Sequence, residues 1–97
     1  MRLDVSEDAR ADLGGIRDFG RRRWGLAQAR VNSTKLRAEM RALAAGTASG
    51  TNAGDVSPGL RRRLCGSHVI FFRTDGDAVR VTRVLGQRQD PGRHLGP

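Results

Sequence analysis

The sequence is poor in cysteine, in aromatic residues and in long apolar runs. One cysteine (Cys65) stands among its 97 residues, with four aromatic residues and no tyrosine. A single cysteine cannot form an internal disulfide or supply a zinc cluster, and this usage fits a reducing cytoplasm. No apolar run approaches the ~18 residues of a membrane span, and the charged N-terminal stretch lacks the apolar region of a signal peptide. We therefore expect a cytoplasmic protein with no membrane segment, no metal and no cofactor.

Large apolar residues are also scarce, which limits the core. Leu, Ile, Val and Phe number 21 in total, near the ~20% level below which highly charged chains tend toward disorder. The length permits one small domain, which we place at residues 1–97. A core this small leaves room for a partner that completes it.

Basic residues exceed acidic ones throughout the chain. There are 18 Lys+Arg, of which Lys35 is the only lysine, against 10 Asp+Glu, so the formal net charge is +8. Residues 1–45 hold 10 basic and 6 acidic side chains and residues 46–97 hold 8 and 4, a net of +4 in each part. The excess predicts attraction to an acidic partner: a nucleic acid, a membrane surface or an acidic protein segment.

The first half of the chain has the periodicity of one short strand and a helical hairpin. Residues 2–5 alternate apolar and polar, and Ser6 is a good N-cap for the helical segment after it. Apolar residues recur at helical spacing across residues 6–45, interrupted at Trp24-Gly25, where Gly25 suits a left-handed C-cap. The second helix has one stripe along Ala29, Ser33, Leu36, Met40 and Leu43.

The second half of the chain has the alternation of β-strands. Residues 46–59 are rich in Gly, Ser and Thr and are expected to form a loop, and residues 60–86 contain three strand-like runs. The middle run, Val-Ile-Phe-Phe, is apolar on both faces, as in a central strand. The Asp75-Gly76 pair after it predicts a type I′ hairpin turn. The tail, residues 87–97, is expected to be loop or disorder.

Together these elements predict an α+β fold in the order β-α-α-β-β-β. It consists of an N-terminal strand, an antiparallel helical hairpin and a three-stranded antiparallel meander. Packing the hairpin on one face of an antiparallel sheet is the simplest arrangement that buries the apolar faces of both. The chain has no visible internal repeat.

No catalytic constellation is present in the sequence. The two histidines, His68 and His94, are not part of a metal-ligand motif, and HExxH, CxxC and GxSxG arrangements are absent. A general-base role for His68 competes with the commoner structural role of a strand histidine beside an apolar run. We therefore expect no catalytic residue and no metal site.

Six arginines within residues 60–86 could form a basic belt across the sheet. Guanidinium groups suit carboxylate and phosphate partners. The alternative is a solvated face whose charges pair locally with the aspartates of the turn and tail, so the pattern leaves both interpretations open. The six are Arg61, Arg62, Arg63, Arg73, Arg80 and Arg83.

Arg83 is the member of this set with the strongest requirement for a partner. Strict alternation places it on one strand face with Val79, Val81 and Leu85. A guanidinium among apolar side chains needs a carboxylate or carbonyl partner, or it lines a binding groove.

Nucleic-acid binding is favoured by the charge and disfavoured by the aromatic content. At least three of the four aromatic residues (Phe19, Trp24, Phe71 and Phe72) are at positions predicted to be core. That leaves no stacking platform of the kind that sheets use to bind single-stranded RNA. The helical half also fits a helix-turn-helix poorly, because both helices are long and the turn is abrupt. We expect no sequence-specific nucleic-acid binding by this chain alone.

Short motifs stand out in combination rather than singly. Gly-Ser-His at residues 66–68 precedes the apolar strand, and Arg-Val-Leu-x-x-Arg-x-Asp occupies residues 83–90. With Pro-Gly-Leu-Arg at residues 58–61 and the Trp-Gly break at residues 24–25, the chain resembles the ParE branch of the RelE/ParE toxins of bacterial type II toxin–antitoxin systems. The resemblance covers nearly the whole chain.

The resemblance implies a toxin that binds DNA gyrase, stabilises cleaved DNA and blocks replication. It also implies a ParD-like antitoxin that wraps around the toxin and holds it inactive. The candidates for target binding are Arg63, His68, Arg83 and Arg88. The candidates for antitoxin binding are Leu13, Ile16, Leu36, Met40, Arg61, Arg63, Arg80 and Arg83, and those for a structural role are Trp24, Gly25 and Phe71.

An alternative function comes from the RelE-like relatives, which cleave ribosome-bound mRNA. They use basic residues and often a tyrosine near the C-terminus. This chain has no tyrosine and no C-terminal lysine, which disfavours that activity.

The sequence departs from the family pattern at three places. Asn32-Ser33 stands where the family usually has an aromatic and an apolar residue, which weakens the stripe of the second helix. Phe72 replaces a common tyrosine, and Gly86 stands where the family often has histidine. If that histidine contributes to toxicity, this chain is a degenerate toxin that retains only antitoxin binding.

Overall fold

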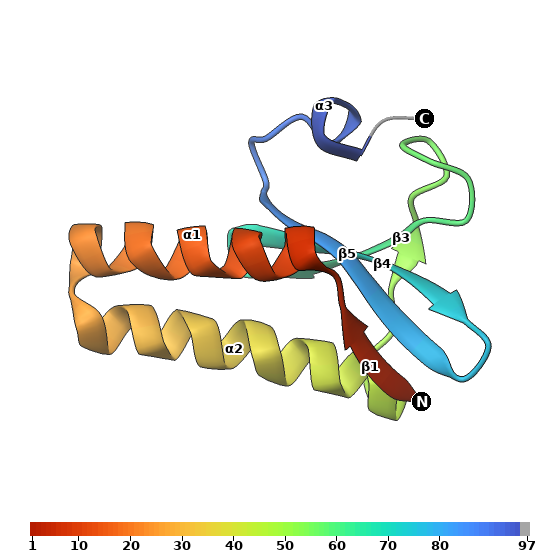
Figure 1. The fold of residues 1–97 in the computed structure, drawn as a ribbon, viewed down its shortest axis with the longest axis horizontal. Helices are drawn as coiled ribbons and strands as arrows, with labels where there is room; N and C mark the ends of the chain where they lie inside the picture. The colour runs from red at the N-terminus through yellow and green to blue at the C-terminus, as the bar shows by residue number, and fades with distance from the viewer. Residues whose placement is uncertain (96–97) are drawn as a thin grey trace.

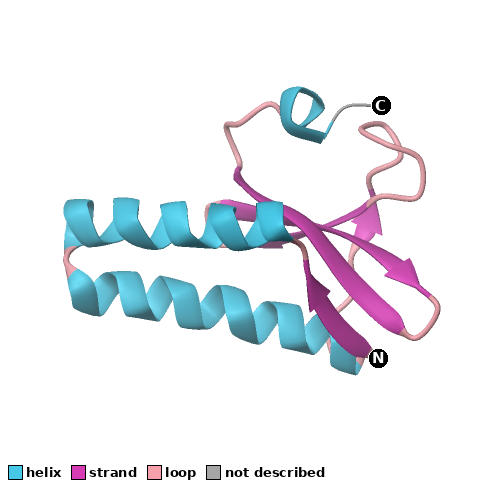
Figure 2. Cartoon of the chain, viewed as in Figure 1, coloured by secondary structure: helices cyan, strands magenta, loops and turns pink. Residues whose placement is uncertain are grey.

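The structure, a computed structural model, describes residues 1–95 as a helical hairpin packed against a five-stranded sheet (Figures 1 and 2). The two long helices lie side by side and run antiparallel, and a short third helix follows the last strand. The elements are β1 (Arg2–Val5), α1 (Glu7–Trp24), α2 (Leu26–Ala45), β2 (Thr51–Asn52), β3 (Arg61–Cys65), β4 (His68–Asp75), β5 (Ala78–Gly86) and α3 (Pro91–Leu95).

The sheet has the strand order β1-β5-β4-β3-β2, which confirms the predicted α+β fold. The meander of β3, β4 and β5 is antiparallel, and β2 adds to β3 in the same sense. However, β1 pairs with β5 in parallel, with Arg2 beside Ala78 and Val5 beside Val81. The expectation of a purely antiparallel sheet is therefore wrong at this edge. Parallel neighbours need a long connection, and here the helices and the meander together provide it.

The ends of the two long helices depend on their capping residues. Ser6 precedes α1, and its Oγ accepts a hydrogen bond from the Ala9 N–H at 3.0 Å. Gly25 separates the helices with a φ of 93° and a ψ of 169°, so it breaks the chain direction but is not the predicted left-handed cap. The left-handed cap is at Gly46, where φ is 81° and ψ is 7°.

Apolar side chains form a core on each face of the sheet. The larger core lies between the sheet and the helices, and it includes Leu36 and Met40 of the predicted stripe. The smaller core lies on the opposite face, where Val56 and Leu95 pack against it. The larger consists of Ala9, Leu36, Met40, Leu43, Ala44, Ile70, Phe72, Val79, Val81 and Val84, and the smaller of Ala53, Leu60, Val69, Phe71 and Leu85.

An extra residue in β5 moves later side chains to the other face. The register pairs Phe71 with Arg83 but Phe72 with Val81, so Thr82 bulges out of the ladder. Val81 and Val84 consequently both pack in the helix-side core, whereas strict alternation put them on opposite faces. The predicted common face of Arg83 with Val79 and Val81 is therefore wrong.

Two segments expected to be loop contain regular structure. Residues 46–59 include the two residues of β2, and the tail from residue 87 includes α3, while residues 96–97 lie outside the described residues. The strand predicted from Leu60 begins at Arg61. The turn between β4 and β5 has a positive φ at Gly76 alone, and because a type I′ turn needs two such residues, that prediction is wrong.

The far end of the helical hairpin extends beyond the sheet (Figure 1). Phe19 and Trp24 lie there with 54% and 57% of their surface exposed. Only Phe71 and Phe72 are buried, so the prediction of at least three core aromatics is wrong, and Trp24 has no structural role in the core. Periodicity identifies a face of a helix but not how far that helix projects past its sheet.

Candidate functional site

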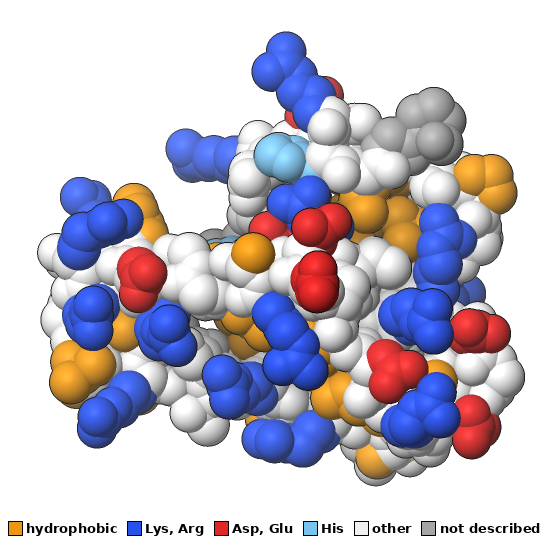
Figure 3. Space-filling view, in the orientation of Figure 1, with side chains coloured by type: hydrophobic (Ala, Val, Ile, Leu, Met, Phe, Trp, Pro, Cys, Tyr) orange, Lys and Arg blue, Asp and Glu red, His pale blue; other side chains and the backbone are white. Residues whose placement is uncertain are grey.

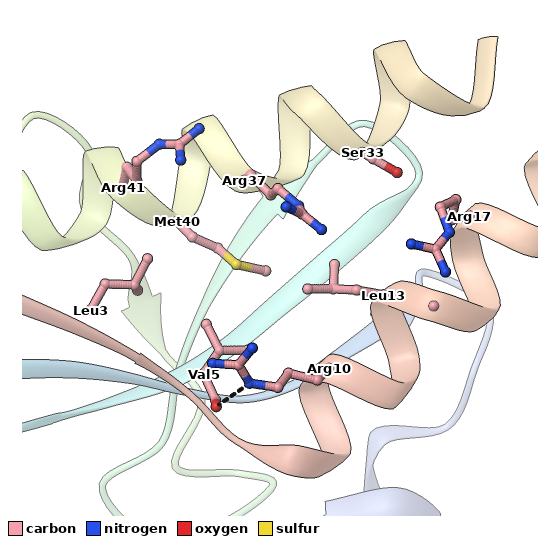
Figure 4. A pocket seen from close by; sticks show the side chains of 10 residues that line it. Leu3, Val5, Arg10, Leu13, Arg17, Ser33, Arg37, Met40 and Arg41 are labelled. Carbon is pink, nitrogen blue, oxygen red and sulfur yellow. Dashed lines mark hydrogen bonds between the residues drawn. The ribbon is translucent and has the colours of Figure 1, made fainter. Parts of the chain in front are cut away.

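A hollow between α1 and α2 combines an apolar floor with a basic rim. We call it the arginine-rimmed groove; its cavity volume is about 360 Å³. Figure 4 shows Leu13 of α1 and Met40 of α2 near the middle of the groove and the arginines around its edge. The groove is lined by Leu3, Val5, Arg10, Leu13, Gly14, Arg17, Ser33, Arg37, Met40 and Arg41.

Small residues create this groove. A Cβ atom built on Gly14 would meet no heavy atom within 4 Å, so the space beside that helix turn is empty. On the facing helix, Ser33 occupies the stripe position between Ala29 and Leu36 and is half-buried. The departure from an apolar residue at position 33 therefore leaves a hollow beside the half-buried Leu13, while Met40, which also lines it, is 1% exposed and packs in the core.

The groove rim carries positive charge that carboxylates match only in part. No acidic residue is among its lining residues. Arg10 Nε donates to the Val5 carbonyl at 3.3 Å, and Arg17 Nε lies 3.8 Å from Asp18 Oδ1 with both side chains more than half exposed. Within residues 1–95, no hydrogen bond or ion pair engages the side chains of Arg37 and Arg41. In Figure 3, apolar atoms are visible between the two helices with Lys and Arg side chains around them.

The arginines of the sheet, in contrast, are largely paired within the molecule. Arg63 Nε donates to Glu39 Oε1 of α2 at 2.7 Å, and its Nη1 donates to the Ser49 carbonyl at 3.0 Å. Pairing within the molecule is thus the better interpretation of the basic belt, but of the aspartates predicted as partners only Asp75 contacts one of these arginines, Arg80. The other partners are Gly50 for Arg61, Asp55 for Arg62, Pro58 and Ser57 for Arg73, and Asp4 and Asp75 for Arg80.

Arg83 has a carboxylate partner, one of the outcomes expected for it from the sequence. Its Nε and Nη2 donate to the two carboxylate oxygens of Asp12 at 2.7 and 2.8 Å, and Nη1 donates to the His94 carbonyl at 3.3 Å. The pKa of the Arg83 guanidinium is raised, chiefly by its hydrogen bonding with Asp12. The side chains of Arg83 and Asp12 are 19% and 14% exposed, so this pair is mostly withdrawn from solvent.

A second hollow lies on the opposite side of α1, toward the β3–β4 turn and the end of β5. Its volume is about 430 Å³, and His68 is one of its lining residues. Burial lowers the pKa of the His68 imidazole. Two of the three departures from the family pattern line the hollows: Ser33 lines the groove, and Asn32 and Gly86 line this second hollow. The third, Phe72, is buried in the larger core.

The remaining predicted residues fall into separate environments. Leu13 and Met40 line the groove, Ile16 lines the second hollow, and Leu36 is buried in the core. Arg88 is exposed after β5. Phe71 is 2% exposed in the smaller core.

The four arginines of the groove rim were not predicted from the sequence. Arg10 and Arg17 flank Leu13 by three and four residues, and Arg37 and Arg41 are one helical turn apart. Such spacing could have identified them as a basic border along the apolar stripes. The consecutive arginines of the strands form a more conspicuous pattern, although their charges are paired within the fold.

No helix within residues 1–95 is both long enough and apolar enough to cross a membrane. In the same part of the chain, no three His, Cys, Asp or Glu side chains are grouped so that they could hold a metal ion.

Sequence comparisons with known proteins identify the protein family of this chain. A family profile described as "ParE toxin of type II toxin-antitoxin system, parDE" matches residues 3–91. The chain is 36% identical over 92 residues to Toxin ParE1 of Caulobacter vibrioides, covering 95% of each, and 36% identical over 92 residues to Toxin ParE1 of Mycobacterium tuberculosis, covering 94% of each. It is 34% identical over 87 residues to Toxin ParE of Escherichia coli, covering 89% of this chain and 84% of that one.

The fold also matches a solved structure titled "Chromosomal ParDE TA system from P. aeruginosa". The TM-score is 0.78 at 22% identity, and the match covers 89% of this chain and 95% of the other. The family match over most of the chain and the identities above 30% carry the conclusion that this chain belongs to the ParE toxin family of type II toxin–antitoxin systems.

Proposed function

We propose that this chain poisons DNA gyrase in the cytoplasm and is neutralised by a ParD-like antitoxin. The observation that carries the proposed neutralisation by an antitoxin is the arginine-rimmed groove, where an apolar floor and a rim of arginine side chains lie together. The proposed poisoning of gyrase is supported by membership of the ParE toxin family.

The groove is suited to an acidic amphipathic segment. Apolar side chains of such a segment would cover the half-buried Leu13, next to the fully buried Met40, and carboxylates on its flanks would face Arg37 and Arg41. A helix laid in a groove presents both kinds of side chain at spacings of three and four residues. Its binding would also complete the core that Gly14 and Ser33 leave hollow, which is the role expected of a partner for a chain with few large apolar residues.

Poisoning of gyrase in this proposal needs binding but no chemistry by the toxin. A ligand shifts an equilibrium between states only by its difference in affinity for them. The toxin must therefore bind gyrase on cleaved DNA more tightly than gyrase on intact DNA. Of the four candidate contacts, His68 lines the second hollow, and Arg88 is exposed next to Gln89, which also lines it. The other two, Arg63 and Arg83, are held by Glu39 and Asp12.

A supercoiling and cleavage assay with purified gyrase tests the target. We expect the toxin to reduce supercoiling and to increase the amount of linear DNA released by detergent. Toxin mixed beforehand with its antitoxin is the matched control and should leave both readings unchanged. Normal growth after induced expression together with unimpaired supercoiling would rule out the gyrase target.

The same induced cells separate this function from mRNA cleavage. Primer extension on cellular transcripts should show no new 5′ ends that depend on the toxin. New ends with unimpaired gyrase would instead identify an endonuclease of the RelE-like class.

A further inference from the structure

The exposed end of the helical hairpin combines aromatic and basic side chains. We call it the hairpin tip, and it consists of Phe19, Arg21, Arg22, Arg23, Trp24 and Arg30, all of them exposed. It lies at the end of the molecule where α1 turns into α2 (Figure 1), and its two aromatic side chains also line the second hollow, which reaches the sheet at His68. Figure 3 shows basic and apolar side chains together over that end.

The hairpin tip holds a large share of the charge of the whole protein. Its four arginines carry a charge of +4 within a chain whose net charge is +8, and Asp18 is the one acidic residue of residues 17–30. The Oδ1 atom of Asp18 lies 3.8 Å from Nε of Arg17, a residue of the groove rim. Among the ion pairs and hydrogen bonds of residues 1–95, none involves the side chains of Arg21, Arg22, Arg23 or Arg30, so these charges are available to a partner.

The two aromatic side chains of the tip are available as well. Phe19 and Trp24 meet edge to face, with ring centroids 5.9 Å apart and planes at 81°. More than half of each side chain still faces solvent. The Arg23 guanidinium lies 6.0 Å from the centre of the Trp24 ring, so a basic and an aromatic group are presented together.

We propose that the hairpin tip binds single-stranded nucleic acid without sequence specificity. Its arginines would contact phosphates, and Trp24 and Phe19 would stack on bases, the combination by which proteins bind single strands. This revises the premise that no aromatic platform is available, although it implies no sequence-specific binding. The proposal does not depend on gyrase being the target.

The arrangement of the arginines favours a flexible strand over a folded acidic protein. Arg21, Arg22 and Arg23 are consecutive in α1, and consecutive helical residues point about 100° apart. They therefore spread around the end of the helix, and no single flat protein surface can meet all three. A strand of nucleic acid can bend around such an end. The apolar groove that an amphipathic protein segment needs lies elsewhere, between Leu13 and Met40.

Fluorescence anisotropy with the full-length toxin tests this proposal. The probes are a labelled 20-nucleotide DNA strand of mixed sequence and the corresponding duplex, each measured at several salt concentrations. The test variant carries Arg22→Gln and Arg23→Gln. The matched control carries Lys35→Gln and Arg93→Gln, which removes the same charge from exposed positions outside the tip. Circular dichroism melts establish that each variant is folded.

We expect the tip variant to bind the single strand about tenfold more weakly and to lower the magnitude of the salt slope by about one to two, since each phosphate contact contributes about 0.7 to that slope. The control should change affinity by less than about threefold, because it loses only long-range attraction. Trp24→Ala should weaken single-strand binding about tenfold and duplex binding less, because paired bases cannot stack on it.

Three outcomes would overturn the proposal. The first is an equal loss of affinity in the tip and control variants. The second is competition by polyglutamate as effective as that by an oligonucleotide of equal charge, which would assign the tip to acidic proteins. The third is toxin self-association abolished by Trp24→Ala with no strand binding, which would assign it to a second copy of this chain.

Discussion

The Asp12 carboxylate accepts a hydrogen bond from the Val84 backbone N–H at 2.9 Å while it holds Arg83 through two further bonds. β1 pairs with β5 only as far as Val81, so beyond that residue this edge of β5 has no neighbouring strand. The Asp12 carboxylate accepts the Val84 N–H that a neighbouring strand would otherwise bind. A side chain of α1 thus completes the hydrogen bonding of the sheet.

Replacing Asp12 with Asn should destabilise the fold. The variant loses the forked contact and leaves the Arg83 guanidinium mostly withdrawn from water without a counter-charge, which costs about 2–3 kcal/mol. In a chain of this length that corresponds to a fall in Tm of more than about 8 °C. Thermal denaturation measures it, with Asp55→Asn as the control, because the carboxylate of Asp55 is 70% exposed beside Arg62. Similar melting of the two variants would contradict this assignment.

Replacing Gly14 or Gly15 with alanine should stabilise the toxin. Both residues lie inside α1, and a Cβ atom built on either meets nothing within 4 Å. Each substitution should add about 0.5–1 kcal/mol, because glycine loses more backbone freedom in a helix than alanine. Urea unfolding measures the gain. Gly46→Ala is the contrasting variant and should destabilise, because Gly46 has a φ of 81°. A loss of stability in both helical variants would show that the space beside α1 is not open.

The stability of the fold should fall as the pH drops below about 7. Burial holds the pKa of His68 below its usual value, so the unfolded chain takes up a proton at about pH 6.5, before the folded chain does. Within this window the unfolded state binds more protons, and the free energy of unfolding therefore rises with pH. Urea midpoints between about pH 5 and pH 7.5 should show a slope that His68→Gln reduces. His94→Gln serves as the control because His94 is exposed; an equal effect of the two substitutions would contradict the role of His68.

Charge reversal at the groove rim should weaken antitoxin binding. Arg37→Glu with Arg41→Glu would place carboxylates opposite those of an acidic antitoxin segment and raise Kd by about tenfold or more, mainly through slower association. Stopped-flow kinetics and calorimetry with the purified antitoxin measure this. Lys35→Glu with Arg93→Glu reverses the same charge away from the groove. If both pairs weaken binding equally, the effect is one of net charge and the groove is not the binding site.

Gly86→His tests whether this chain is a degenerate toxin. A Cβ atom at position 86 would lie 3.4 Å from Gln89 Oε1, which accepts the Gly86 N–H at 2.7 Å, so the backbone has room for a side chain at the edge of the second hollow. The proposed function predicts that the unmodified chain already inhibits growth on induced expression, whereas toxicity that the histidine restores would support the degenerate interpretation. Strong toxicity of the unmodified chain, with no gain from the histidine, would exclude the degenerate interpretation. Equal antitoxin affinity of the two proteins controls for misfolding.

Local patterns were enough to predict the order of β1, α1, α2, β3, β4 and β5, though not β2 or α3, and several individual contacts. Ser6 could be recognised as a cap because its partner, Ala9, is three residues away. Arg83 could be predicted to need a carboxylate or carbonyl partner or to line a groove, but the partner could not be identified as Asp12, because 71 residues separate them. The faces of Val81 and Val84 were misassigned since nothing in the residue types around Thr82 announces a bulge.

The site was harder to predict than the fold. A groove exists where side chains fail to fill space, and that depends on how Gly14 and Ser33 meet across two helices. The pairing of the strand arginines likewise depends on acidic residues brought in from distant segments, such as Glu39 for Arg63. The helix arginines that remain available to a partner, such as Arg37 and Arg41, can be distinguished from the paired ones only in the folded structure.

The parallel pairing of β1 with β5 has a consequence for the timing of folding. β1 is synthesised first but can pair only after β5 has been synthesised, because Leu3 pairs with Val79 and Val5 with Val81. Leu3 and Val5 also line the groove. A nascent chain therefore cannot present a finished groove until residues 78–81 have emerged, and contacts of such high sequence separation form slowly. An antitoxin that recognises the groove would meet its partner only after synthesis of the toxin is nearly complete.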